Sequence, residues 1–170
     1  IQDIYKVKLS DGLKDGNIPK EDLAVMKEVI DDEGETHDHL DHLDMRFKLF
    51  VGTDVKRGKF PIHNDELQKI NDEWVNICKE SNLWEIMACH CAIEGWYPSI
   101  STMFETEYRK RGFTDEELEI FIAHQGADVE HSDAQYAILD KNYDKLDVAR
   151  IEQMVKRTFG TSKAYEQMKL

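Results

Sequence analysis

The chain contains only three prolines among its 170 residues, and this scarcity leaves long stretches that can form unbroken helices. No segment alternates apolar and polar residues in the manner of a half-buried strand. Apolar residues recur instead at helical spacing, as at Leu67, Ile70, Trp74 and Ile77. We therefore expect an all-α fold.

Capping patterns set the expected helix boundaries. Pro19 suits the start of one helix, and Asn64 can cap another. Gly112 closes a helix, and the capping box Thr114-Asp115-Glu116-Glu117 opens the next. The expected helices span residues 2–13, 19–51, 64–80, 83–110, 114–140 and 146–168. We also expect the second of these to loosen near Gly34, a loop over 52–64, and a break in the last helix near Gly160. Because no linker or repeat is visible, residues 1–170 are expected to form a single domain.

The chain is strongly acidic, with 22 Lys and Arg residues against 35 Asp and Glu residues and a net charge of −13. A nucleic-acid or anionic-membrane partner needs a basic face, so neither is expected. Most of the acidic excess is interpreted as solvated surface, and the rest as carboxylates gathered inside for a metal. No apolar run reaches the roughly 18 residues of a membrane-spanning helix, and no signal-peptide pattern is visible. The chain opens at Ile1 rather than at a methionine, so we expect its true start to lie upstream.

Three cysteines are present, Cys78, Cys89 and Cys91, and no Cys-x-x-Cys motif occurs. An odd count without that motif disfavours a disulfide scaffold and favours a reducing compartment, so a cytoplasmic location is expected. Cys89 and Cys91 point to opposite sides of a helix, which makes them a poor metal clamp. We interpret these cysteines as core residues.

The expected helix over 114–140 carries His124, Asp128 and His131 on one face, because offsets of four and three residues complete two helical turns. Two imidazoles and a carboxylate on one stripe are a good set of metal ligands. Further carboxylates and open positions favour iron and oxygen chemistry. The same stripe also has a structural interpretation, in which the aspartate bridges two surface histidines.

Glu94 stands among apolar neighbours on the expected helix over 83–110. A carboxylate in such surroundings is costly unless it is paired or bound to a metal. Pro98, one turn later, cannot donate to the carbonyl of Glu94, so we expect a kink that opens room for metal or substrate. Alternatively, Glu94 pairs with His90 one turn earlier, and His90 is interpreted as a core residue or one that steadies Glu94.

Glu35 and His42 are seven residues apart on the expected helix over 19–51, again two turns along one face. Asp32 and His39 have the same spacing and compete for the same role. With Glu94 and the histidine–aspartate stripe, the chain offers three carboxylates and three histidines on three helices. This is the donor set that a di-iron carboxylate site needs. No Glu-x-x-His motif occurs, so a ferritin-like version of such a site fits badly.

The order of these residues resembles the heme-oxygenase-like di-iron oxidases and oxygenases, whose pattern is Glu-x6-His, a lone Glu, and His-x3-Asp-x2–3-His. The intervals from His42 to Glu94 and from Glu94 to His124 match that family. The matching residues in this chain are Glu35, His42, Glu94, His124, Asp128 and His131. The opening segment also looks like that fold, since residues 9–23 read as a helix end, a small-residue turn and a new helix. The resemblance covers almost the whole chain.

The resemblance implies a single-domain helical bundle of the heme-oxygenase-like type, with those six residues as metal ligands and catalytic site. It implies two Fe(II)/Fe(III) ions that bind O2 as a peroxo-bridged diferric species and oxidise a small amine- or carboxylate-bearing substrate. Amino-acid N-oxygenation, oxidative carbon–carbon cleavage and decarboxylation all occur in the family. The lysine that its four-aminobenzoate synthase is thought to consume is replaced here by Phe104, which counts against that activity. The resemblance is compatible with a homodimer.

Two other functions stay open from the sequence. One is a metal-independent enzyme of the thiaminase-like or quinone-cofactor-synthase-like type on the same fold, with Cys89 or Cys91 as the nucleophile in the thiaminase case. The other is a non-enzymatic iron-binding helical protein. Heme binding by His42 or His124 is a minor alternative.

Overall fold

The computed structural model describes residues 7–12, 18–32, 49 and 65–167, and the following concerns these residues alone. They form helices and turns and contain no strand, so the expected all-α class is confirmed for this part of the chain. The elements are a helical segment at 7–12, α2 (Lys20–Asp32), α4 (Asp65–Glu80), α5 (Leu83–Lys110), α6 (Glu119–His124), α7 (Ala127–Lys141), η2 (Tyr143–Lys145) and α8 (Val148–Gln167).

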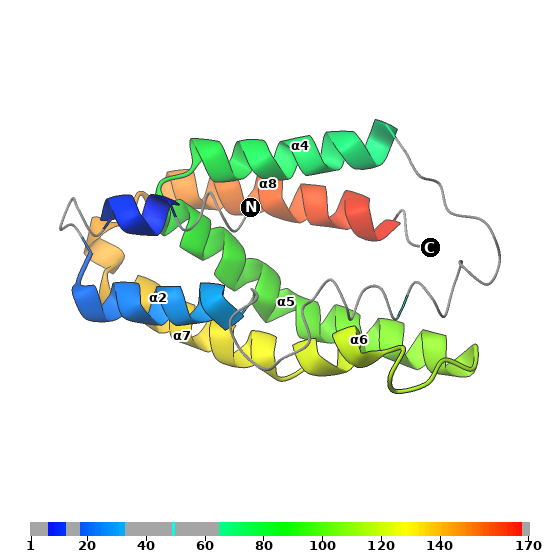
Figure 1. The fold of residues 1–170 in the computed structure, drawn as a ribbon. Coiled ribbons are helices and arrows are strands. Elements are labelled where there is room, and N and C mark those ends of the chain that lie inside the picture. The colour runs from blue at the N-terminus through cyan, green and yellow to red at the C-terminus, as the bar shows by residue number, and fades with distance from the viewer. Residues whose placement is uncertain (1–6, 13–17, 33–48, 50–64, 168–170) are drawn as a thin grey trace.

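The long helix α5 is the central element of the bundle (Figure 1). Helices α4 and α8 lie side by side along one of its sides, and α2 and α7 lie side by side along the other. Helix α6 packs on the C-terminal part of α5. A side chain on the middle of α5 can therefore meet side chains of α7, and this contact positions the candidate site.

Local signals at both ends determine the extent of α5. The Asn82 side chain accepts a hydrogen bond from the Glu85 backbone N–H at 2.9 Å, and the Glu85 carboxylate accepts one from the Asn82 N–H at 3.1 Å. This capping box satisfies N–H groups that the first helical turn leaves unpaired. At the other end Gly112 has φ of +87°, a left-handed conformation that side chains disfavour. The expected boundaries of this helix, 83–110, are confirmed.

The expected single helix over 114–140 is wrong, because the chain breaks it into α6 and α7 at Gln125 and Gly126. The capping box forms, with the Thr114 N–H donating to Glu117 Oε2 at 2.9 Å, but a turn follows and α6 begins only at Glu119. The N–H groups of Gln125 and Gly126 bond carbonyls three residues back at 3.4 Å, so the α-helical ladder stops there. Glycine at the break lowers the cost of leaving the helix.

The other boundary predictions have mixed outcomes. The helix expected over 64–80 is confirmed as α4. The break expected near Gly160 is absent, because α8 runs through it. Helix α5 likewise continues through Pro98, and the Thr102 hydroxyl donates to the Pro98 carbonyl at 2.9 Å. The continuation of α2 beyond Asp32 lies outside the described residues.

Apolar side chains from all layers meet around α5. Met26 of α2, Met87 of α5 and Ile138 of α7 belong to one cluster, and Ile77, Cys89 and Met154 join α4, α5 and α8 in another. All three cysteines are buried, which agrees with their interpretation as core residues. Over the described ranges, no helix combines the length and the apolar character needed to cross a bilayer.

Candidate metal centre

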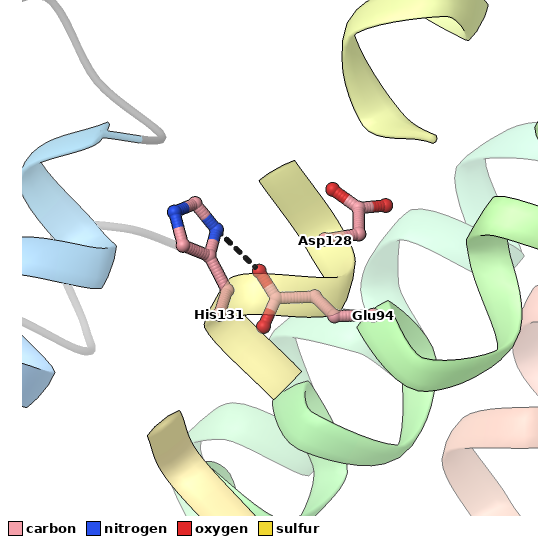
Figure 2. Close-up of side chains that lie close together, drawn as sticks. All are labelled: Glu94, Asp128 and His131. Atoms are coloured by element: carbon pink, nitrogen blue, oxygen red, sulfur yellow. Dashed lines mark hydrogen bonds and ion pairs between the residues drawn. The ribbon is translucent and has the colours of Figure 1, made fainter. Parts of the chain in front are cut away.

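Three of the six predicted ligands come together between α5 and α7. Glu94 reaches across from α5, and Asp128 and His131 come from α7 (Figure 2). One oxygen of each carboxylate and one imidazole nitrogen lie within 4.8 Å of one another. Glu94 is 4% exposed and Asp128 is 2% exposed. Two carboxylates and an imidazole at this separation are a set that could hold one divalent cation away from bulk water.

Close packing of the two helix backbones makes this gathering possible. Gly95 follows Glu94 and faces Ser132, which follows His131; a Cβ at Gly95 would lie 2.9 Å from Ser132 Oγ. The Ser132 hydroxyl donates to the Cys91 carbonyl at 3.0 Å, and Cys91 Sγ donates to the Ser132 carbonyl at 3.4 Å. These bonds hold the two helices together within one turn of the candidate ligands. A Cβ at this position would crowd Ser132 Oγ, so glycine favours this close approach of the two helices.

Three side chains hold Glu94. His131 Nδ1 lies 3.2 Å from Glu94 Oε1, and His90 Nδ1 lies 3.1 Å from Glu94 Oε2. The Gln135 amide also donates to Glu94 Oε2. The expectation that His90 steadies Glu94 is confirmed by this contact. The pairing offered as an alternative account of Glu94 therefore coexists with the three-residue cluster.

Burial alone would raise the pKa of Glu94, but hydrogen bonds from His131 and His90 and the charges on those rings outweigh it. The net result is a pKa below the ordinary 4.5. Glu94 is therefore ionised near neutral pH, as a carboxylate must be to bind a cation.

In the metal-free protein, the contacts of Glu94 with His90 and His131 are expected to make the free energy of unfolding depend on pH in the acid range. A carboxyl group whose pKa is lower when folded stabilises the fold above its unfolded pKa, and that stabilisation is lost as pH falls through the folded value. Below the ordinary 4.5, the free energy of unfolding should therefore fall more steeply in wild type than in Glu94→Gln. Urea titrations at a series of pH values, with chelator present, measure both slopes. Equal slopes would mean that the histidine contacts do not hold the carboxylate in solution.

The structure does not bring His124 into the three-residue cluster. The break at Gln125 and Gly126 leaves it at the end of α6, so the expected continuous stripe with Asp128 and His131 is corrected. Its Nδ1 lies 2.5 Å from the Ile120 carbonyl and donates to it, and its ring packs edge-on against Tyr97. The predicted ligands Glu35 and His42, and the competing His39, lie outside the described residues.

The cysteines near the site have the environment of core residues. Burial is the main cause that raises the pKa of the Cys89 thiol, to about 11. Burial also raises the pKa of Cys91, against a smaller lowering by its hydrogen bond with Ser132. A nucleophilic cysteine needs a lowered pKa and access to substrate. Both thiols are buried and have raised pKa values, so neither has the environment typical of an activated nucleophile.

Sequence reasoning missed Gln135, which is fully buried against Glu94. It lies one turn after His131, so it shares a face of α7 with a predicted ligand. The signal available in the sequence was a polar side chain one helical turn after a predicted ligand. Its amide could not be distinguished by sequence from one that faces solvent.

Comparison of the chain with protein-family models, with curated proteins and with solved structures finds no match. The function is therefore argued from the site. Its donor set suits a cation such as Fe(II) or Mn(II), because hard carboxylates and an imidazole are the ligands that non-haem iron takes in proteins. Three of the six residues thus have the chemistry to hold an ion of the kind that the family resemblance implies.

Proposed function

We propose that this protein is a non-haem di-iron oxidase or oxygenase that uses O2 to oxidise a small amine- or carboxylate-bearing molecule. The observation that carries the proposal is the buried cluster of Glu94, Asp128 and His131 between α5 and α7. Two carboxylates and an imidazole whose ligand atoms lie within 4.8 Å of one another offer a buried donor set for a cation. Residues on either side of this cluster also follow the order of the heme-oxygenase-like family.

In this proposal Glu94, Asp128 and His131 hold one ion, and Glu35, His42 and His124 complete the ligand set for two. The bound iron supplies the activation of dioxygen. The chain's own residues supply an ionised carboxylate, fixed by His90 and Gln135, and a site from which the packed helices α5 and α7 exclude water. Low water content strengthens the attraction between the carboxylates and the ions.

Anaerobic loading with Fe(II), elemental analysis and rapid mixing with O2 test the proposal together. We expect about two equivalents of iron per chain, because oxygen chemistry at carboxylate sites of this kind uses a pair of ions. We also expect O2 consumption and a visible charge-transfer band that depend on one member of a panel of amino acids and fatty acids. The identity of that member gives the substrate class.

Three outcomes would redirect the assignment. Less than about one equivalent of bound iron would favour a metal-independent enzyme on the same scaffold, because a resident metal must be retained to act. Iron uptake without consumption of any co-substrate would favour a non-enzymatic iron-binding protein. Heme addition that produces a Soret band would point to the heme alternative.

A further inference from the structure

The amide of Gln135 has a partner for each of its polar atoms. Its Nε2 donates to Glu94 Oε2 and to the His131 carbonyl, the latter at 3.2 Å, and its Oε1 lies 3.3 Å from His90 Nδ1. The side chain is 0% exposed. One buried amide therefore joins a candidate ligand, the backbone of a second and the histidine that pairs with the first.

These partners determine which way the amide faces. Glu94 Oε2 and the His131 carbonyl can only accept, so the NH2 group must point toward them. Gln135 Oε1 then faces His90. The atoms beside His90 Nδ1, Gln135 Oε1 and Glu94 Oε2, are both acceptors, so this nitrogen must carry a proton. The orientation follows from hydrogen-bonding capacity alone.

The two oxygens of Glu94 thereby receive different roles. Oε2 accepts from Gln135 and also faces His90 Nδ1 at 3.1 Å, whose single proton it shares with Gln135 Oε1. Oε1 has His131 as its hydrogen-bond partner and is the oxygen on the side of the three-residue cluster. Rotation of the carboxylate would break the bonds to Oε2 and cost the buried Gln135 amide one of its hydrogen-bond partners.

We propose that Gln135 is a positioning residue that fixes Glu94 so that Oε1 alone is presented to the metal. This inference rests on the proposed function, because it assumes that Glu94 binds an ion. Glu94 would then bind an ion through Oε1, while Oε2 stays with its hydrogen-bond partners. Residues that orient metal ligands in this way typically change metal affinity about 10–100-fold when they are lost.

Asn142, the C-cap residue of α7, provides a matched control. Its Nδ2 donates to the Asp22 carboxylate at 3.1 Å and to the Ile138 carbonyl at 2.9 Å, and its Oδ1 accepts from Lys145 at 2.7 Å. It is 2% exposed. The bonding pattern repeats that of Gln135, but the carboxylate is on α2 and is not part of the cluster.

The experiment compares Gln135→Leu, Asn142→Leu and wild type by anaerobic calorimetric titration with Fe(II), with circular dichroism and thermal unfolding as fold checks. Both variants should lose stability, because each removes buried hydrogen bonds. Only Gln135→Leu should lose Fe(II) affinity, by about 10–100-fold. Infrared difference spectra between loaded and metal-free protein should show a single-oxygen carboxylate signature that Glu94→Gln removes and Gln135→Leu alters.

The outcomes separate the two proposals. If wild type binds no Fe(II), the proposed function fails, and this inference fails with it. If wild type binds and Gln135→Leu binds equally well with an unchanged infrared signature, the positioning role alone is overturned. Equal affinity losses in Gln135→Leu and Asn142→Leu would also overturn it, since they would show a general effect of stability. If Gln135→Leu does not fold, Gln135→Met keeps the shape without the amide and replaces it in the comparison.

Discussion

Replacement of Asp128 by asparagine is expected to abolish tight Fe(II) binding and O2-dependent turnover while the helical fold is kept. Asparagine has nearly the same shape, so packing at this 2% exposed position changes little. It removes one of the two carboxylates in the cluster, and the dication then faces the single charge of Glu94. Affinity should fall more than about 100-fold, because loss of residues that only support ligands already costs about 10–100-fold.

Asp133→Asn is the control for this change. Asp133 is also on α7 and is exposed, so the substitution removes the same charge from the same helix without touching the cluster. Calorimetric Fe(II) titration and O2 uptake should be unchanged in this control. Full turnover in Asp128→Asn, or an equal loss in Asp133→Asn, would remove Asp128 from the site and require another set of ligands.

The parts of the fold that could be predicted from the sequence are those fixed by neighbours along the chain. The ends of α5 depend on Asn82, Glu85 and Gly112, which act within a few residues, and both boundaries were predicted correctly. Helical spacing alone also placed Asp128 and His131 on the same face, and α7 carries both into the cluster. Local capping and periodicity are sufficient for such features.

The features that were missed depend on competition or on contacts between helices. The helix from Thr114 was expected to continue to about Asp140, but Gly126 lies at the break between α6 and α7. Gln135 acquires its role only when α5 places Glu94 opposite it. Spacing along one helix carries no information about which residues face it from another.

Gly95→Val is expected to separate α5 from α7 and weaken the site without altering any candidate ligand. A Cβ at this position would lie 2.9 Å from Ser132 Oγ and 3.8 Å from Ser132 Cβ, and valine adds two further methyl groups. Rotation of the Ser132 hydroxyl would break its bond to the Cys91 carbonyl, so the clash cannot be relieved without cost. Overpacking of this kind costs about 1–3 kcal/mol in the free energy of unfolding. Fe(II) affinity should fall at least about 10-fold, because Glu94 is adjacent to the displaced residue and small misplacements of ligand-supporting groups have effects of that size.

Two further variants test whether space is the cause. Gly160 is also within a helix, but a Cβ there meets no atom within 4 Å, so Gly160→Val should leave Fe(II) affinity unchanged. In Gly95→Val/Ser132→Gly the obstructing hydroxymethyl group is gone, and affinity should recover toward the wild-type value even though the bond to Cys91 is lost. Calorimetric Fe(II) titration and urea unfolding of the three variants measure these effects. If the double variant binds no better than Gly95→Val, the close approach of α5 and α7 at Gly95 does not control the separation of Glu94 from Asp128 and His131.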